Sequence, residues 1–309
     1  MKIFVIILSY NSVRYTRDCL DSVLRSTIPV DVVVVENGSR DDSATVLQEY
    51  KDRIHYLPQK SNLGFSGGNN VGISYAIDHD ADYLFLLNMD TRVEEDTIEK
   101  LVKVAEVGNE KLLLSPLPRT FAGVFDLGFV KKCCNNLTEF EFRNFITDLY
   151  DRKPLKPYYT ADFICASALL VPVTAVKECG GFCTLFYPAY YEDNELFNRM
   201  TLFSWKLAFV PSVIYYHDVE DRATCSFPDS HLITMRTFSE VLDLRNPFFK
   251  TYCVRLVSEL GKIPANLLLC RCRNVACHFH VVVRLLKAYF PLKKYRKSIV
   301  QKWKNRTEK

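Results

Sequence analysis

Three short apolar runs near the N-terminus constrain the fold of this chain more than any other feature. They are Ile3–Leu8, Val30–Val35 and Tyr83–Leu87, and polar residues do not alternate with apolar ones inside them. Runs of this kind are typical of strands that are buried on both faces. Helical patterns separate them, and such alternation predicts an α/β fold whose mostly parallel sheet is flanked by helices.

Helix and strand signals extend this pattern along the chain. Ser39-Arg40-Asp41-Asp42 resembles a capping box and predicts a helix running toward Tyr50. Thr91-Arg92-Val93-Glu94 matches the box fully and predicts a helix start there. Residues 108–160 show no clear pattern, and we interpret them as variable connecting structure. The remaining expected elements are a helix in Ser12–Ser26, a strand or strand-turn in Ala161–Val173, a helix in Glu192–Phe203 and a strand in Lys206–Tyr216.

Polar residues follow each of the three apolar runs. Ser9 and Asn11 follow the first, Glu36 the second, and Asn88 and Asp90 the third. Open α/β sheets bind ligands at the carboxyl ends of their strands, so these side chains are candidates for one site. A carboxylate such as Asp90 suits a divalent cation that bridges two phosphates, although a helix-capping role is the simpler alternative for this residue alone.

Asn62–Gly72 concentrates glycine and asparagine just ahead of a helical pattern. Such a segment predicts a loop whose backbone N–H groups approach phosphate oxygens, with an ordinary glycine-rich turn as the alternative. The segment lacks the lysine of a P-loop and a true G-x-G-x-x-G, which excludes those two nucleotide motifs.

Taken in order, these motifs resemble glycosyltransferase family 2, in particular its rhamnosyltransferase-like branch. The motifs are Ile7-Leu8-Ser9-Tyr10-Asn11, Val35-Glu36-Asn37-Gly38-Ser39, Asn62–Gly72, Asn88-Met89-Asp90, Gly180-Gly181-Phe182 and Tyr191-Glu192-Asp193, over roughly residues 1–220. The resemblance implies a GT-A fold with a Rossmann-like sheet, a nucleotide-diphosphate sugar donor, a divalent metal (Mg²⁺ or Mn²⁺) and inversion at the anomeric carbon.

The resemblance also implies a role for each matched residue. Asp193 stands at the general base position, and Asp90, with His217, at the metal. The implied donor-binding residues are Ser9, Asn11, Glu36, Asn62, Gly64, Gly68, Asn69 and Asn88, and the implied acceptor residues are Gly181, Phe182 and Glu192. Three positions depart from the family pattern: Asn88 replaces the first acid of D-x-D, Glu36 stands where Asp is more usual, and Glu195 replaces a frequent Asp. Whether Asp193 or a neighbouring carboxylate is the base, and whether His217 is a ligand or a core-edge histidine, stays open at this stage.

Charge is distributed unevenly along the chain. Residues 245–309 hold 16 Lys and Arg against 2 Asp and Glu, whereas residues 1–244 hold 24 against 34. From about Leu232 the pattern also becomes helical, so we divide the chain into a GT-A domain (1–230) and a basic, amphipathic helical extension (231–309). Basic amphipathic helices bind anionic membrane surfaces, and a helical cap with a solvated basic tail is the alternative. Arg271, Arg273 and Arg284 interrupt the apolar stretch there, so we expect no helix long enough to cross a membrane.

The family resemblance implies an inverting, metal-dependent hexosyltransferase that acts in cell-surface polysaccharide synthesis. The alternatives are a catalytically silent sugar-nucleotide-binding partner and a sugar-phosphate nucleotidyltransferase, whose N-terminal signature is missing here. The expected partners are a nucleotide-diphosphate sugar, a glycan or lipid-linked acceptor and an anionic membrane surface, with no nucleic acid and a homodimer left open. Scattered cysteines without C-x-x-C pairs indicate reduced thiols, so we expect a cytoplasmic protein, peripheral on the cytoplasmic face of the membrane.

Overall fold

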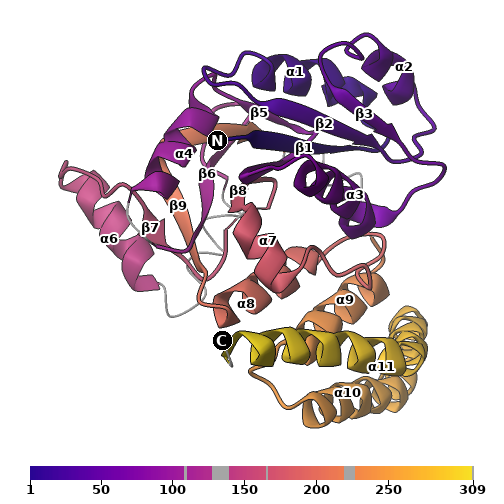
Figure 1. The fold of residues 1–309 in the computed structure, drawn as a ribbon. Helices are drawn as coiled ribbons and strands as arrows, with labels where there is room; N and C mark the ends of the chain where they lie inside the picture. Colours follow the sequence, from indigo (N-terminus) through magenta and orange to yellow (C-terminus); the bar gives the residue numbers. More distant parts are fainter. Residues whose placement is uncertain (108–109, 127–138, 165, 219–226, 308–309) are drawn as a thin grey trace.

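A computed structural model describes residues 1–107, 110–126, 139–164, 166–218 and 227–307 (Figure 1). The strands are β1 (Ile3–Ser9), β2 (Asp31–Glu36), β3 (His55–Pro58), β4 (Tyr83–Asn88), β5 (Thr91–Val93), β6 (Leu112–Thr120), β7 (Tyr159–Thr160), β8 (Ala168–Pro172) and β9 (Lys206–His217). The helices are α1 (Val13–Val23), α2 (Ser43–Gln48), α3 (Gly64–Asp78), α4 (Thr97–Glu106), α6 (Glu139–Tyr150), α7 (Val173–Cys179), α8 (Glu192–Leu202), α9 (Asp229–Leu242), α10 (Phe248–Leu268) and α11 (Cys272–Thr307).

All the strands belong to one sheet with the order β3-β2-β1-β4-β8-β6-β9-β5, and β7 pairs with β9 outside this path. Strands β3, β2, β1 and β4 are mutually parallel, as the three apolar runs predict. Beyond β4 the sheet is mixed, because β8 runs antiparallel to both β4 and β6 while β9 runs parallel to β6. The α/β prediction is confirmed, and the parallel part is limited to the N-terminal half and the β6–β9 pair.

Helices cover both faces of the sheet because successive strand residues point to opposite sides. Phe4 and Ile6 of β1 belong to the core that also contains residues of α3, α7 and α8, whereas Val5 and Ile7 belong to the core that contains residues of α1, α2 and α4. Figure 1 shows α1 and α2 on one side of the N-terminal strands and α3 on the other. Two hydrophobic cores therefore hold the sheet rigid and fix the ends of its strands.

Two predicted helix starts are wrong. Thr91–Val93 forms β5, which pairs antiparallel with the end of β9, and helix α4 begins only at Thr97. Sheet pairing therefore overrides the local capping signal. Helix α2 begins at Ser43 rather than near Ser39, because Asp41 accepts hydrogen bonds from the N–H groups of Ser43 and Val13, at 3.0 and 3.1 Å, and so shapes a turn there.

The interpretation of residues 108–160 as connecting structure is also wrong. Leu112–Thr120 forms β6 inside the sheet, between β8 and β9, and Glu139–Tyr150 forms helix α6. Two prolines, Pro116 and Pro118, obscure the strand signal in the sequence. The pairing with β9 shifts its register between Pro116 and Leu117, so the sheet accommodates these residues at an irregularity.

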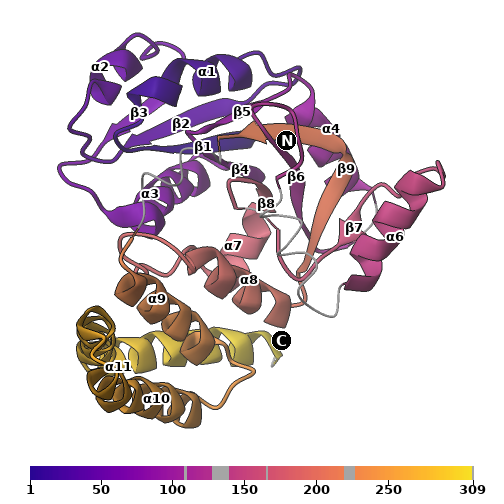
Figure 2. The ribbon, with the colours of Figure 1, turned by 180° about the vertical axis from the view of Figure 1, so that it is seen from behind.

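Helices α9, α10 and α11 form a third layer beneath α7 and α8, in both views of the ribbon (Figures 1 and 2). Their shared core includes Phe186 of the preceding segment together with Met235, Tyr252 and Leu285. Arg296 of α11 donates to the carbonyls of Val241, Asp243 and Asn246 at 2.6, 2.7 and 2.5 Å.

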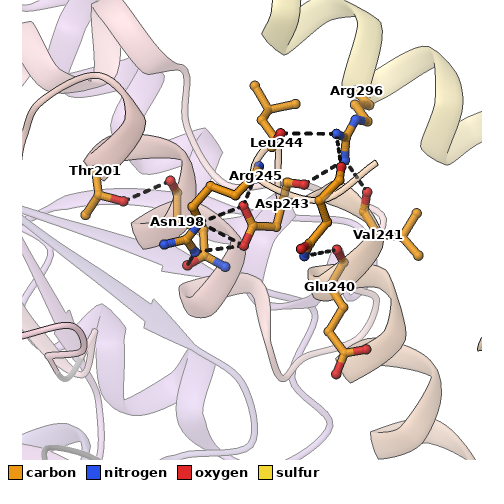
Figure 3. A network of polar contacts seen from close by, with 9 residues as sticks. Asn198, Thr201, Glu240, Val241, Asp243, Leu244, Arg245 and Arg296 are labelled. Atoms are coloured by element: carbon orange, nitrogen blue, oxygen red, sulfur yellow. Dashed lines mark hydrogen bonds and ion pairs between the residues drawn. The ribbon is translucent and has the colours of Figure 1, made fainter. Parts of the chain in front are cut away.

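The contacts around the end of α9 form one network (Figure 3). Arg245 pairs with Asp243 and also donates to Asn198 of α8 at 2.6 Å. A cation at the last carbonyls of a helix satisfies groups that lack intrahelical partners. Within the basic extension, α11 is thus fastened to the end of α9, and Arg245 fastens the extension to helix α8.

One described helix, spanning Cys272–Arg306, is long and apolar enough to cross a membrane on length and composition alone. The expectation that no C-terminal helix is long enough to cross a membrane is therefore wrong by length and composition. The same test is also passed by core helices of soluble proteins, and 22% of the relevant stretch is buried inside the protein.

Candidate functional site

The polar residues predicted at the strand ends do meet at one edge of the sheet. Ser9 of β1 lies in register with Glu36 of β2, and Leu8 lies in register with Asn88 of β4. Because these strands are parallel, their carboxyl ends face the same way. The Oγ atoms of Ser9 and Ser12 are 2.8 Å apart and both residues are buried, which fixes the turn after β1.

Asp90 and His217 come together at this edge although the sequence separates them widely. Strands β5 and β9 pair so that Thr91 lies opposite His217, and the N–H of Asp218 donates to the carbonyl of Asp90 at 3.0 Å. The Nε2 of His217 lies 3.4 Å from Oδ1 of Asp90. His217 is 1% exposed, whereas the Asp90 side chain is 33% exposed and so opens toward solvent.

These two side chains fit a divalent cation as a two-ligand site. A carboxylate oxygen and an imidazole nitrogen are both accepted ligands, and their separation allows them to hold one ion together. Within the described residues there is no cluster of three His, Cys, Asp or Glu that could hold a metal. Mg²⁺ sites of this kind are usually completed by waters and substrate phosphates rather than by a full protein cage.

Glu36 uses its carboxylate to shape the turn after β2. Its oxygens accept the N–H groups of Ser39 at 2.6 Å and of Gly38 at 3.3 Å, and the residue is 5% exposed. Asn11 belongs to the same arrangement, because its backbone N–H donates to Ser39 Oγ at 3.0 Å and its Oδ1 accepts the N–H of Arg40 at 2.8 Å. The turns after β1 and β2 therefore brace each other.

Asn37, which the sequence reasoning does not single out, connects this edge to helix α3. Its Oδ1 accepts the N–H of Leu63 at 2.9 Å, and its Nδ2 donates to Asn62 Oδ1 at 3.0 Å. Asn62 in turn accepts the N–H of Gly64 at 2.7 Å. Asn37 is 1% exposed. A buried asparagine at the end of an apolar strand, ahead of Gly38, is the signal that could reveal this clamp.

The prediction of a glycine-rich loop is wrong, because Gly64–Asp78 is helix α3. A Cβ atom at Gly68 would lie 2.2 Å from Leu8 Cδ1, and one at Gly72 would lie 2.5 Å from Ile6 Cγ2. The glycines therefore let α3 pack closely on β1. The implied donor roles of Gly64, Gly68 and Asn69 stay predictions, and Asn69 here donates to the carbonyl of Phe65 at 3.0 Å.

The predicted acceptor residues Gly181 and Phe182 are attached to α3 by Asn70. The Oδ1 of Asn70 accepts the N–H of Phe182 at 2.9 Å, and its Nδ2 donates to the carbonyl of Phe182 at 2.8 Å. Arg199 supports the same segment from α8, donating to the carbonyls of Gly180 and Gly181 at 2.9 and 2.8 Å. The Gly180–Phe182 segment is therefore held from two sides.

Asp193 lies in the first turn of α8, on a different element from the Asp90 and His217 pair. Its Oδ1 accepts the N–H of Asn194 at 2.8 Å. The two residues before the helix, Tyr190 and Tyr191, have φ values of 81° and 68°. Non-glycine residues adopt this region at a cost of about 1–2 kcal/mol each, and such strain is concentrated at functional sites.

The strained turn is held by its neighbours. The N–H of Phe65 at the start of α3 donates to the carbonyl of Pro188 at 2.7 Å, and a Cβ atom on Gly64 would lie 2.9 Å from that oxygen. Through Asn37, Gly64 and Pro188, contacts run from the sheet edge to the start of α8. The backbone ahead of the predicted base is therefore tied to the start of α3 and, through Asn37, to the sheet edge.

Three further residues at the sheet edge were missed by sequence reasoning. Asp218 is 8% exposed and accepts the hydroxyl of Tyr15 at 2.8 Å. Arg92 and Arg119 stand on either side of Tyr216, because β5 and β6 both pair with β9 at that position. Their spacing in sequence gives no hint of this, since the pairing of distant strands creates it.

Comparison with known proteins shows which family model the sequence matches. The sequence model of Glycosyl transferase family 2 matches residues 4–169, which is more than half of the chain. The chain is 35% identical over 106 residues to glycosyltransferase GlyA of Streptococcus pneumoniae, a match that covers 33% of this chain and 15% of GlyA.

Two other similarities cover more of the chain. It is 27% identical over 220 residues to N-acetylglucosaminyl-diphospho-decaprenol L-rhamnosyltransferase of Mycobacterium tuberculosis, covering 66% of this chain and 71% of that protein. The crystal structure of S. aureus TarS 1-349 in complex with UDP-GlcNAc superposes with a TM-score of 0.55 at 16% identity, covering 82% of this chain and 70% of the other. That likeness supports the GT-A fold.

Proposed function

Because the chain belongs to glycosyl transferase family 2, we propose that it transfers a sugar from a nucleotide-diphosphate donor to a hydroxyl group of a glycan or lipid-linked acceptor. We further propose that it is a hexosyltransferase, that the transfer inverts the anomeric carbon, and that the product belongs to a cell-surface polysaccharide. The relative from Mycobacterium tuberculosis is named as a rhamnosyltransferase that acts on a lipid-linked sugar diphosphate, which supports this class of acceptor.

One observation carries the proposal: Asp90 and His217 lie 3.4 Å apart at the carboxyl edge of the sheet. This is where open α/β sheets bind their ligands. Asp90 and His217 would hold Mg²⁺ or Mn²⁺, and when bound the ion would supply Lewis-acid stabilisation of the charge on the departing diphosphate.

The residues of the chain itself supply the proton transfer. Asp193 is partly exposed and stands in the first turn of α8, so it is accessible to an acceptor hydroxyl. As the acceptor oxygen bonds to the anomeric carbon, the carboxylate takes its proton and the bond between that carbon and the phosphate oxygen breaks. The nucleoside diphosphate leaves from the opposite face, so a single displacement inverts the configuration.

Two other parts of the site restrict where the substrates lie. The Gly180–Phe182 segment, held by Asn70 and Arg199, would form a fixed surface against which the acceptor lies. The turns that carry Asn11 and Glu36, which brace each other, would limit where the nucleotide end of the donor can lie. Fixed positions of this kind contribute to rate by orienting the reactants.

The test is release of nucleoside diphosphate from a panel of nucleotide sugars with Mg²⁺ or Mn²⁺, with and without a lipid-linked acceptor. Asp193→Asn should abolish acceptor-dependent release while donor binding persists, and Asp90→Ala should also weaken binding of Mn²⁺ measured by titration calorimetry. Asp52→Asn, at an exposed surface position, is the matched control and should behave as the wild type.

Either of two results would contradict the proposal. Release that continues unchanged in both Asp193→Asn and Asp90→Ala would remove the assigned roles. Tight donor binding without turnover of any sugar would instead favour a silent sugar-nucleotide-binding partner.

A further inference from the structure

The turn between α10 and α11 exposes a group of large apolar side chains. Leu267, Leu268 and Leu269 are 58%, 86% and 60% exposed at the end of α10. Val257 and Leu260 are exposed two to three turns earlier, at spacings that place them on the same face of the helix as Leu268. We call these five residues the apolar tip.

The apolar tip is not needed to hold the fold together. In α10 the buried residues are Tyr252 and Glu259, whereas all five residues of the apolar tip are exposed. Tyr252 packs in the core shared by α9 and α11, and its hydroxyl donates to the carbonyl of Leu285 at 2.8 Å. Exposed apolar patches beyond what packing requires are typical of interaction surfaces.

The charges around the tip have one sign. Arg271 and Arg273 are exposed and follow the tip directly. Residues 248–307 contain a single carboxylate, Glu259. That carboxylate is buried, and it already pairs with Lys262 at 2.5 Å and His278 at 2.7 Å. The cationic surface therefore meets no exposed acidic side chain on either helix, and its complement is an anionic partner.

Helix α11 is held against the protein, which argues for a surface position rather than a membrane span. Val281, Leu285 and Leu292 are buried in the core of the third layer. Arg284 and Arg296 make polar contacts with His231 and with the carbonyls of the 241–246 segment. Crossing a bilayer would require all of these contacts to break.

We propose that the apolar tip inserts into the headgroup region of an anionic lipid membrane, with Arg271 and Arg273 against the lipid phosphates. Amphipathic helices with an apolar face and a basic rim bind membranes in this way. The seven described cysteines are free, and Cys270 and Cys272 at the tip are exposed, which fits the cytoplasmic face of a membrane. This attachment goes beyond the proposed transfer reaction and does not depend on it.

The experiment is sedimentation of the full chain with vesicles of phosphatidylcholine alone or of phosphatidylcholine mixed with phosphatidylglycerol. The wild type should sediment with the anionic vesicles and be released by high salt or alkaline carbonate. Leu267→Ser/Leu268→Ser should abolish sedimentation, and Arg271→Gln/Arg273→Gln should weaken partitioning by roughly fivefold for each charge removed. All substituted side chains are solvent-exposed, so the variants should unfold at the wild-type temperature.

Matched controls come from exposed positions on the body of the protein. Val107→Ser removes a side chain that is 75% exposed, and Lys51→Gln removes an exposed cation. Both should bind vesicles as the wild type does. Three results would overturn the proposal. The first is tip variants that sediment with vesicles as well as the controls do, and the second is a bound fraction that resists carbonate and therefore spans the bilayer. The third is a wild type that does not bind vesicles but forms a dimer without lipid, with the tip variants monomeric.

Discussion

Arg284 Nη1 lies 3.0 Å from His231 Nδ1, and this contact joins helix α11 to helix α9. A guanidinium can only donate, so Nδ1 accepts and the proton of the neutral ring is on Nε2. That Nε2 lies 2.8 Å from the carbonyl of Ala189 and donates to it. Ala189 directly precedes the strained residues Tyr190 and Tyr191, so the basic extension positions the backbone ahead of the proposed base.

Removal of this contact should lower turnover without unfolding the protein. In His231→Ala the carbonyl of Ala189 loses its donor, and a displacement of about 1 Å at the reacting groups can cost about 100-fold in rate. We expect kcat to fall by about 10- to 100-fold, with the KM for the donor nearly unchanged. Steady-state kinetics with saturating donor would measure this.

Three variants test whether the fall in kcat comes from displacement of the backbone at Ala189. His231→Gln keeps an N–H donor within reach of Ala189 and should recover part of the lost kcat. Lys287→Gln removes an exposed cation from α11, one turn from Arg284, and should be neutral, whereas Arg284→Gln should resemble His231→Ala in sign. Equal kcat in wild type and His231→Ala would show that the turn is held without the extension.

The pH dependence of stability should carry the signature of the same histidine. Burial, with the nearby charge of Arg284, lowers the pKa of His231 below its ordinary value of 6.5, although the bond to Ala189 opposes this. Between the lowered native pKa and 6.5 the unfolded chain binds more protons than the native chain, so stability falls as the pH falls. The contribution is complete above pH 6.5 and is lost below the native pKa.

Urea unfolding of wild type and His231→Gln at pH 7.5 and at pH 5.5 separates this contribution from the other titrating groups. The wild type should lose more stability on acidification than the variant does. Identical losses in the two proteins would mean that His231 does not titrate differently in the native and unfolded states.

The sequence predicts the parts of the site that depend on short segments. Apolar runs such as Ile3–Leu8 reveal buried strands, and the polar residues behind them mark the binding edge. The contact between Asp90 and His217 is not readable in this way, since it arises from pairing of β5 with β9, two strands far apart in the chain. Thr91 shows most plainly what local patterns cannot predict. Its capping box favours a helix start, but pairing in the sheet places Thr91 in strand β5 instead.

Arg199 offers a prediction about the segment that would contact the acceptor. It forms a two-point ion pair with Glu195, both bonds at 2.8 Å, and both side chains are buried. Burial alone would lower the pKa of Arg199, but the neighbouring Glu195 carboxylate raises it, so the guanidinium stays charged. Breaking a buried pair from one side typically costs about 3–5 kcal/mol, because an uncompensated charge remains.

Arg199→Leu should therefore lower the free energy of unfolding by about this amount and also release the Gly180–Phe182 segment. Arg199→Leu/Glu195→Leu should be less destabilised than Arg199→Leu, because no buried charge is left without its partner. Arg236→Leu is the control, since Arg236 also pairs with a carboxylate four residues away but is largely exposed. Denaturant unfolding of the four proteins measures the order, and equal losses in Arg199→Leu and Arg236→Leu would contradict it.

Alanine substitutions at helical glycines test whether close packing, rather than phosphate binding, explains the glycine pattern of α3. A Cβ at Gly72 would meet Ile6 Cγ2, which cannot move because the side chain is branched at Cβ and buried. A Cβ at Gly68 would meet the flexible end of Leu8, and one at Gly261 in α10 would meet nothing within 4 Å. The three positions therefore differ in the space beside the helix.

Substitution by alanine should produce a graded series. Gly261→Ala should raise the free energy of unfolding by about 0.5–1 kcal/mol, since alanine favours the helix and meets no clash. Gly72→Ala should lower the free energy of unfolding by about 1–3 kcal/mol through overpacking. The stability of Gly68→Ala should lie between those of the other two variants, because the Leu8 side chain can rotate away. Chemical denaturation of the three variants gives the order directly. If Gly72→Ala were as stable as Gly261→Ala but failed to bind a nucleotide sugar, the glycines would serve the donor rather than the contact between α3 and β1.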